Sequence, residues 1–575
     1  MEILKETISV CPECMEHVHA QIVADESSDE VYMKKKCDIH GEFIDRLATK
    51  ISEYKWQMNF TDAIGSTVNN ETTPEKLLSD TKKGCPFDCG LCKNHKTAPN
   101  IALIDLTNRC NLACPVCFAN AGATGYLVEP NYEEVVQILE HFRSIRPNPP
   151  PLLQLSGGEP TLHPDLLKIV KVAKEMGFIE VMLTTNGIRM AKSVQYCIDL
   201  IDAGVDAIYL SFGGVEAETT KKLYGIALNK SKMQSIKNFH EALKSRPKSK
   251  SAIILVPTII KGINDHEIGN IFNVAKEYIG TISGITFQPV SLCGRISQED
   301  VLKMRYTTSD LKKEINRVTN NTVSRFYPIA TASKFIRLVN WFDDKDEWCP
   351  NSHSDCGFAT IIILDQNNNW ISIDDYVDVE GMIKYANDFY DRIKQMKPIK
   401  PFTMLNVEKP NNSLLSTVME NSDKLSDLTF RSAQRVIFLA GAMKYLKPNL
   451  TNMLNNKDLR KFIFDFINLF MEPSLKSASH FMKDRHLLLS SMHFQDAYNF
   501  DINRVSRCLV HYGVIDPDDP KKVLEIPFCA MNTIHRERIE REIAEKKRQL
   551  ISKEALKQEA SNSINEIVQL ESVLP

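Results

Sequence analysis

The sequence lacks a long apolar run, a secretion signal and a dominant charge. The stretch AIILVPTII at 252–260 is much too short for a spanning helix, which needs roughly 18 apolar residues. The start, MEILKETISVCPEC, has neither the basic nor the apolar region of a signal peptide. Lys and Arg number 70 against 73 Asp and Glu, which leaves a net charge of −3. These absences argue against a membrane-spanning or secreted protein and against a basic field that recruits nucleic acid.

The overall composition is that of an ordinary globular protein, with 25% charged and 43% hydrophobic residues. The length allows about three or four domain-sized units, although a large α/β barrel could absorb two of them. No solenoid-type repeat is present. The cysteines cluster at short spacings in a large chain without a secretion signal, which indicates a reducing cytoplasm and metal ligation rather than disulfides.

The pattern C-x3-C-x2-C occurs twice within 84–120. The first copy is Cys85, Cys89 and Cys92, and the second is Cys110, Cys114 and Cys117. With 15 Cys in 575 residues, one such triplet is expected by chance at roughly the per-cent level and two far less often. Three cysteines at this spacing can bind three corners of an iron–sulfur cube.

The first unit, residues 1–60, contains two short metal-binding motifs, CPEC and CDIH. They supply Cys11, Cys14, Cys37 and His40, and two short strands are predicted between them around a polar turn. Such knuckles form a tetrahedral site for zinc or a single iron, unless His40 is simply a surface histidine. Residues 61–100 read as a polar linker that ends with the first cysteine triplet.

From residue 101 the pattern alternates between apolar strands and amphipathic helices. Continuous apolar strands of this kind indicate a buried parallel sheet. The six predicted strands are 101–107, 152–156, 179–185, 206–212, 252–260 and 283–290. They predict an α/β fold with a partial (β/α)6 barrel over 101–335. Residues 336–575 are predicted to form a mostly helical C-terminal domain, and its charged last helix is predicted to face solvent or a partner.

The position of the second triplet favours it as the catalytic one. It follows the first barrel strand, at the end of a β/α barrel that carries active sites. The next strand ends in Ser156, Gly157, Gly158 and Glu159. Two glycines allow a ligand to approach the backbone closely, and Glu159 can accept a hydrogen bond from an ammonium group.

With these motifs the chain resembles the radical S-adenosylmethionine (SAM) enzymes over 101–335. The resemblance implies a [4Fe–4S] cluster on Cys110, Cys114 and Cys117, whose fourth iron binds SAM. One electron then cleaves SAM to a 5′-deoxyadenosyl radical, which abstracts hydrogen from an unactivated carbon. Val116 stands where many members carry an aromatic residue, and Phe118 follows the third cysteine.

Polar residues at the later strand ends are further candidates for SAM contacts. Thr185, Asn186 and Ser211 would lie near the ribose and carboxylate, and Ile260, Gly262 and Asn264 could flank the adenine. The alternative for each residue is an ordinary turn or cap.

The remaining cysteines suffice for two auxiliary clusters. Cys197 lies inside an amphipathic helix and is predicted to be a core residue. The other eight are Cys85, Cys89, Cys92, Cys293, Cys349, Cys356, Cys508 and Cys529. Eight thiolates can bind two [4Fe–4S] clusters, but the sequence does not determine which distant cysteine completes which cluster.

Three segments are similar to the archaeal tetraether lipid synthases: the N-terminal CPEC and CDIHGEF motifs, CNLACPVCFANAG, and 490–532. This resemblance implies coupling of the terminal methyl carbons of isoprenoid diether phospholipids. It also implies a rubredoxin-like iron, two auxiliary clusters, a ferredoxin or flavodoxin as electron donor, and peripheral contact of a cytoplasmic enzyme with the membrane. The segment 514–525 is longer than the family's turn, which leaves the loop geometry open.

Three other functions compete with lipid coupling: radical methylation of a dihydropterin or similar heterocycle, peptide modification, and simple electron transfer. The Gly157–Glu159 motif argues against an electron carrier. A lipid enzyme needs a long apolar channel, expected between the barrel and the 410–490 helices, whereas a pterin enzyme needs a short polar pocket. The apolar faces of 431–446 and 458–471 suit lipid tails and, equally, an ordinary helical core.

Overall fold

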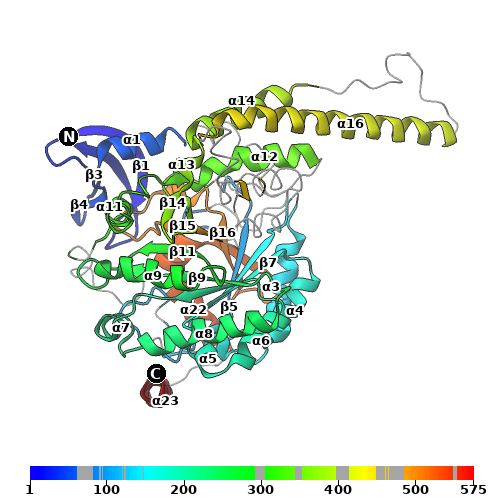
Figure 1. Cartoon of the computed structure of the whole chain (residues 1–575). Helices are drawn as coiled ribbons and strands as arrows, with labels where there is room; N and C mark the ends of the chain where they lie inside the picture. Colours follow the sequence, from blue (N-terminus) through cyan, green and yellow to red (C-terminus); the bar gives the residue numbers. More distant parts are fainter. Residues whose placement is uncertain are drawn as a thin grey trace.

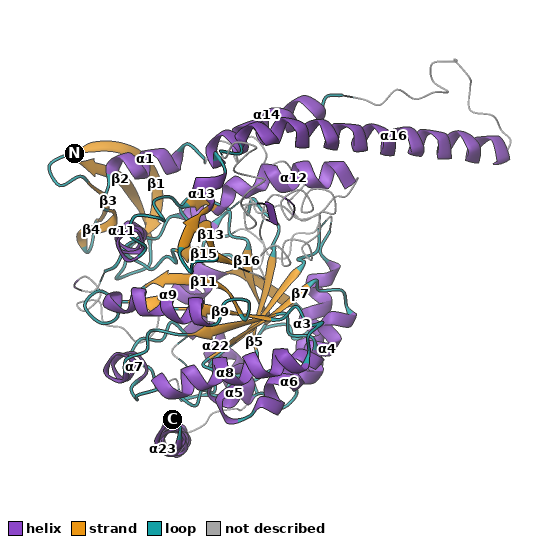
Figure 2. Cartoon of the chain, in the orientation of Figure 1, coloured by secondary structure: helices purple, strands orange, loops and turns teal. Residues whose placement is uncertain are grey.

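The structure is a computed structural model of the 575-residue chain, shown in Figures 1 and 2. The residues that it describes are 1–60, 82–89, 92, 95–119, 121, 125–146, 148–291, 303, 305–343, 352–396, 413–447, 460–461, 464, 485–547 and 553–574.

The N-terminal unit is a small antiparallel sheet followed by one helix. Its strands, in spatial order, are β1 (Glu2–Val10), β2 (His17–Asp25), β3 (Glu30–Cys37) and β4 (Gly41–Ala48), and helix α1 spans Ile51–Met58. β2 and β3 confirm the two strands predicted between the metal-binding motifs. Ile22, Val31, Ala48 and Tyr54 form the buried core of the unit, so α1 packs on one face of the sheet.

The second sheet has 13 strands and runs through the centre of the molecule (Figure 2). Its central strands are parallel and follow the order β11-β9-β8-β7-β6-β5. Their bounds are β5 Ile101–Asp105, β6 Leu152–Ser156, β7 Glu180–Thr185, β8 Ala207–Ser211, β9 Ala252–Val256 and β11 Ile282–Pro289. All six predicted barrel strands are therefore confirmed.

The predicted strand 252–260 is interrupted at Pro257. Proline has no N–H to donate to a strand ladder, so β9 ends at Val256 and a two-residue strand, β10 (Thr258–Ile259), follows. Most of the helices between the strands bury one face against the sheet in a single large core, whereas Leu223 and Tyr224 pack beside the cysteine loop in a separate cluster. These helices are α3 Tyr132–Ser144, α4 Leu166–Glu175, α5 Ile188–Lys192, α6 Val194–Ala203, α7 Ala217–Tyr224, α8 Asn229–Ser245 and α9 Ile268–Glu277.

The C-terminal region also adds strands to both edges of this sheet, which the sequence pattern did not predict. β15 (His486–Met492) pairs in parallel with β11, and β16 (Val510–Ile515) pairs in parallel with β5. The outer strands β12 (Tyr327–Pro328), β13 (Gly357–Leu364), β14 (Trp370–Ser372) and β17 (Val523–Pro527) are antiparallel to their neighbours.

Of the remaining helices, the long α16 projects from the body beside α14 and α12 (Figure 1). Their bounds are α11 Thr308–Val318, α12 Ala332–Asp343, α13 Ile373–Tyr376, α14 Val379–Ile393, α16 Ser413–Ala442, α20 Ile502–Val505, α21 Phe528–Ala530, α22 Arg536–Lys546 and α23 Lys553–Val573. No helix within these described ranges has both the length and the hydropathy to cross a bilayer.

The charged C-terminal segment is not merely a solvated helix. In α22 the buried Arg536 forms ion pairs with Asp105 at 2.7 Å and with Glu540 at 2.8 Å, while Ile539 and Ile543 pack into the core. A buried charge is tolerated where it has such partners. The prediction from charge density was therefore wrong for α22, because the partners come from its own chain.

Candidate functional site

The second cysteine triplet lies on the loop that follows β5. Cys110, Cys114 and Cys117 are half-buried, and the Cys110 thiol interacts electrostatically with those of Cys114 and Cys117. Burial, reinforced by Cys114 and Glu159, raises the pKa of the Cys110 thiol well above its usual range. Three thiolates in a partly buried, apolar environment would repel one another and would be poorly solvated. Binding to a soft, positively charged metal cluster removes this cost.

The Gly157–Gly158 pair lets the cluster loop itself approach the strand end. Gly158 N donates to Thr107 O at 2.7 Å, and Glu159 N donates to Arg109 O at 2.8 Å. Gly157 has a φ of +137°, and a Cβ on either glycine would collide with the Thr107 or Arg109 backbone. The two glycines were expected to let a ligand approach the backbone closely. In the structure it is the cysteine loop of the same chain that makes this close approach.

Glu159 links the strand ends around this loop. Its carboxylate is 1% exposed and accepts hydrogen bonds from the Thr161 hydroxyl at 2.6 Å, the Thr185 hydroxyl at 2.7 Å and Asn186 N at 2.8 Å. The Asn186 amide donates to Asn111 Oδ1 of the cysteine loop at 2.7 Å. The structure therefore brings Glu159, Thr185 and Asn186 together beside the cysteine triplet.

The other proposed SAM-contact residues make internal contacts. Asn264 is fully buried; its Oδ1 accepts from Ile260 N at 2.9 Å, and its amide donates to the carbonyls of Gly213 and Thr258. The Ser211 hydroxyl lies 3.3 Å from the Tyr224 hydroxyl. Asn264 therefore fits the alternative of a cap, which the sequence left open.

Lys232 is a residue of this site that the sequence did not reveal. It is 1% exposed, and its ammonium donates to Asn186 O at 2.7 Å and lies 4.6 Å from the Tyr224 ring centre. Burial lowers the pKa of Lys232 to about 8, although the negative charges of Cys114 and Glu159 oppose this shift. The signal was available, because Lys232 precedes Ile236 by one helical turn and so lies on the buried stripe of α8.

The N-terminal motifs converge on one point. The ligand atoms of Cys11, Cys14, Cys37 and His40 all lie within 4.8 Å of one another. The Cys14 and Cys37 sulfurs are 3.9 Å apart, near the edge of a tetrahedron with roughly 2.3 Å metal–sulfur bonds. The backbone N–H groups of His40 and Ile39 lower the pKa of Cys37 to about 6, which favours the metal-binding thiolate. These four residues fit a tetrahedral metal ion.

The first triplet lines a separate cavity. Cys85, Cys89 and Cys92 line a small cavity of about 10 Å³ together with Asp88, His95 and Pro527. Burial raises the pKa of Cys85 to about 12 and that of Cys89 well above its usual range. The donor set of three cysteines fits an iron–sulfur cluster.

Cys508 lies between this group and a third one. In addition to burial, the charge of Cys508 contributes to the raised pKa of Cys89, and the charges of Cys529 and Cys356 contribute to the raised pKa of Cys508. Six of the eight cysteines predicted for auxiliary clusters are therefore gathered in one region, and the arrangement leaves open which cluster Cys508 would complete. Cys293 and Cys349 lie outside the described residues. Cys197 is fully buried in α6, as predicted for a core residue.

A larger cavity of about 50 Å³ lies between the radical-cluster loop and Cys529. Its walls come from the cysteine loop, the ends of β10 and β11, and the segments 494–495 and 528–532; the lining residues are Val116, Phe118, Thr258, Gln288, Pro289, Val290, Ser291, Phe494, Gln495, Phe528, Cys529 and Asn532. The Phe494 and Phe528 rings stack with centres 4.3 Å apart. The lining combines aromatic faces with amide groups, and no charged side chain is among these lining residues.

Comparison with known proteins places these features in a family. Residues 104–275 match the Radical SAM superfamily, and residues 3–49 match the HMPTM N-terminal zinc ribbon domain. The chain is 33% identical over 541 residues to the 7,8-dihydro-6-hydroxymethylpterin dimethyltransferase of Methanocaldococcus jannaschii, covering 93% of this chain and 95% of that protein.

More distant matches cover only parts of the chain. The GTP 3′,8-cyclase of Lactiplantibacillus plantarum is 29% identical over 185 residues, which are 32% of this chain and 52% of that protein. The structure of Streptococcus suis SuiB bound to the precursor peptide SuiA aligns with a TM-score of 0.31 at 16% identity, over 52% of this chain and 69% of that one.

Together, the cysteine loop, the zinc-ribbon ligands and the near full-length match show that the chain binds a [4Fe–4S] cluster, SAM and a further metal ion, and that it belongs to the radical SAM superfamily, in the family of the M. jannaschii dimethyltransferase.

Proposed function

We propose that the chain is a radical SAM methyltransferase that acts on a reduced pterin or a similar flat heterocycle. The observation that carries this proposal is the aromatic, amide-lined cavity beside the radical-cluster loop. The near full-length relative, named as a pterin dimethyltransferase, supports the same substrate class.

The aromatic wall suits a planar ring. The Phe118 ring lies 5.9 Å from that of Phe528, which also stacks on Phe494 and Tyr512. Flat faces of this kind pack well against a heterocycle in offset or tilted geometry. Because Phe118 follows Cys117 directly, a ring held against it would lie next to the cluster loop.

Amide groups supply hydrogen bonds for ring edges. Gln288 lines the cavity near the end of β11, and within the described parts of the chain its side-chain amide has no hydrogen-bond partner. Asn532 is already engaged, since its amide donates to Phe528 O at 3.0 Å and its Oδ1 accepts from Arg536. Gln288 is therefore the residue that we assign to recognition of the substrate's ring nitrogens or carbonyl.

When bound, the cluster and SAM supply the 5′-deoxyadenosyl radical for hydrogen abstraction. The chain's residues have simpler tasks. The three cysteines of the triplet hold the cluster, and Glu159 fixes the strand ends around it. The apolar wall of the cavity excludes water from the reacting carbon. We further propose two auxiliary clusters on the remaining cysteines and a ferredoxin or flavodoxin as electron donor.

Lipid coupling is the second candidate, and two observations favour it. Half of the cavity lining is apolar, and the lining contributes no carboxylate to pair with a pterin ring. Val436 and Ile437 on α16 are also exposed, at 59% and 51%, as an apolar contact with a membrane would require. The long channel predicted between the barrel and the 410–490 helices stays a prediction, because most of 448–484 lies outside the described residues.

One anaerobic experiment separates the candidates. Reconstituted enzyme is incubated with reductant and methyl-deuterated SAM, and with either 7,8-dihydro-6-hydroxymethylpterin or a diether phospholipid. We expect mass spectrometry to find added methyl groups on the pterin, and the label tells whether SAM donates them. A lipid product that has lost two hydrogens, with the pterin unchanged, would replace methylation by carbon–carbon coupling.

The same assay tests the role of Gln288. Gln288→Leu is expected to raise the KM for the pterin while SAM cleavage without substrate stays unchanged, because the lost group contacts only the substrate. Gln234→Leu, on the outer helix α8, is the matched control. An unaltered KM in the Gln288 variant would remove this residue from the site.

A further inference from the structure

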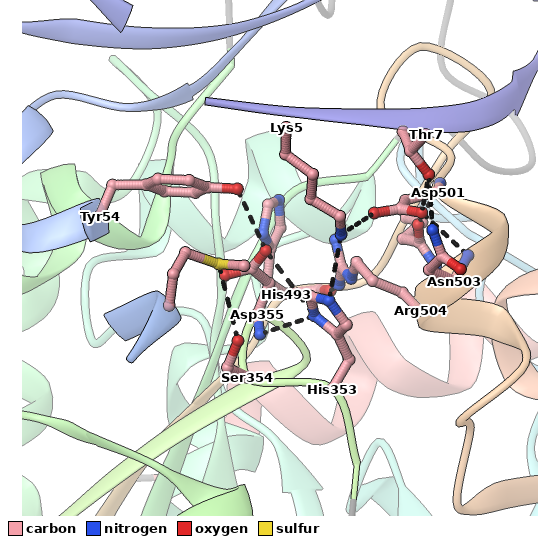
Figure 3. A network of polar contacts seen from close by, with 12 residues as sticks. Lys5, Thr7, Tyr54, His353, Ser354, Asp355, His493, Asp501, Asn503 and Arg504 are labelled. Atoms are coloured by element: carbon pink, nitrogen blue, oxygen red, sulfur yellow. Dashed lines mark hydrogen bonds and ion pairs between the residues drawn. The ribbon is translucent and has the colours of Figure 1, made fainter. Parts of the chain in front are cut away.

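A buried polar network connects the N-terminal metal-binding unit to the segment before Cys356 (Figure 3). The Tyr54 hydroxyl of α1 donates to Asp355 Oδ2 at 3.3 Å, and the Ser354 hydroxyl lies 3.8 Å from the Met58 sulfur of the same helix. Ser354 is fully buried and Asp355 nearly so. Two contacts from α1 therefore hold the two residues that directly precede Cys356.

Strand β1 reaches a second segment of the same region. The Thr7 hydroxyl donates to Asp501 Oδ1 at 2.6 Å, and Lys5 Nζ lies 3.3 Å from Asp501 Oδ2. Asp501 is 1% exposed and caps the short helix α20 by accepting from Asn503 N at 2.9 Å. Because the cap residue is bound to β1, the N-terminal unit also fixes where α20 begins.

Helix α20 carries Arg504, whose guanidinium faces the cysteines. Arg504 is 4% exposed and donates through Nη2 to His493 O at 2.5 Å, while its Nε has no acceptor among the described residues. Its charge interacts with Cys356, Asp355 and Cys529. A buried cation with an unused donor needs anionic partners, which thiolates bound to a metal cluster would provide.

We propose that Arg504 sets the reduction potential of the auxiliary cluster held by Cys356 and Cys529, and that the N-terminal unit keeps Arg504 in place through Asp501. This inference rests on the proposed auxiliary cluster. Reduction adds a negative charge to a cluster that is already anionic through its thiolates. A fixed positive charge at short range favours the reduced state and raises the potential. Arg504 is thus a positioning and tuning residue rather than a catalytic one.

The alternative is that Arg504 only supports the chain by binding the His493 carbonyl. That purely structural role predicts lower stability in variants but no effect of side-chain charge on the potential. Lysine retains the charge and loses the planar fork, whereas methionine retains most of the apolar volume and loses the charge. Comparing the two substitutions therefore separates charge from packing.

The test is an anaerobic redox titration of the full-length reconstituted protein, followed by electron paramagnetic resonance, with iron counted per chain. The variants are Arg504→Met, Arg504→Lys and Lys5→Met. The control is Lys55→Met, which breaks an exposed ion pair with Glu2 in the same unit. We expect a more negative midpoint for Arg504→Met, a midpoint near wild type for Arg504→Lys, and a smaller negative shift for Lys5→Met.

Each other outcome has a defined meaning. A wild-type midpoint in Arg504→Met with full iron content would overturn the inference. If Arg504→Met loses its auxiliary iron, the Lys5→Met variant is decisive. A midpoint potential shifted relative to Lys55→Met supports the coupling between the N-terminal unit and the auxiliary cluster, and an unshifted one refutes it. If the wild-type protein itself holds only the radical cluster and the N-terminal metal, the proposed auxiliary clusters are absent and that premise fails first.

Discussion

The substitution Gly158→Ala is expected to disable the radical cluster selectively. The added Cβ would lie 2.7 Å from the Arg109 carbonyl carbon and 2.9 Å from Asn108 O, and closer still to Arg109 O. Real Cβ contacts are essentially never shorter than 3.0 Å. These neighbours are backbone atoms, so the cysteine loop must retreat from the strand end, because no flexible side chain can rotate away.

The free-energy cost of the substitution follows from the contacts that are broken when the cysteine loop retreats. Overpacking of a tight site costs about 1–3 kcal/mol. The hydrogen bonds from Gly158 N to Thr107 O and from Glu159 N to Arg109 O add about 1 kcal/mol each. A total of about 3–5 kcal/mol is enough to displace Cys110, which lies one residue beyond Arg109, from its ligand position.

The assay measures the spectroscopic signal of the reduced SAM-bound cluster and the rate of 5′-deoxyadenosine formation. Gly269→Ala in α9 is the control, because its Cβ would meet only Val318 atoms at 3.6 and 3.8 Å, an ordinary contact. We expect loss of signal and cleavage in Gly158→Ala, with the N-terminal metal retained. A Gly158→Ala enzyme with wild-type signal and cleavage rate would refute the close approach of the loop.

Replacement of Cys110, Cys114 or Cys117 by Ala is expected to abolish 5′-deoxyadenosine formation by removing an iron ligand; undiminished cleavage would disprove the assignment. Metal analysis of well-reconstituted protein should find about thirteen irons per chain, or twelve irons and one zinc, and a count of four would reject the auxiliary clusters. Ile567→Ala in α23, at a side chain 1% exposed, should weaken docking of that helix by about 2–4 kcal/mol in hydrogen exchange, whereas its neighbour Val568→Ala, 51% exposed, should not. Burial and Asp206 raise the pKa of the half-buried Glu180 to about 7, so its stabilising contribution is present at low pH and is lost as pH rises through 7. Glu180→Gln should therefore be more stable than wild type above pH 7, by up to about 2 kcal/mol in urea unfolding, and equal stability at pH 8 would contradict this.

The barrel strands and the metal motifs could be predicted from the sequence because their signals are local. Apolar runs bounded by turns indicated β5 to β9 and β11, and cysteine spacing indicated the cluster loop. The strands β15 and β16 could not be predicted, because their role depends on pairing with β11 and β5 far away in the sequence. Local pattern carries no information on such partners.

In the candidate site, too, residues in local motifs could be predicted and residues that depend on distant partners could not. Cys110 and Glu159 were predicted from their motifs, whereas Arg504 was not, since its significance arises only when α20, Cys356 and Cys529 meet. Asn264 shows the opposite case. A polar residue at a strand end suggested a ligand contact, but three internal hydrogen bonds occupy its side chain. Side-chain type alone cannot separate these two roles.

The pairing of β16 with β5 has a consequence for how the protein is made. Val510 is the partner of Ile101, about 400 residues earlier in the chain. During synthesis the first barrel strand therefore emerges long before its neighbour, and its backbone donors and acceptors stay open on that side. Unpaired strand edges favour aggregation, and long-range pairing slows folding. Expression as a truncated barrel ending near residue 335 should yield aggregated protein, and efficient production of the whole chain should depend on slow growth or chaperones.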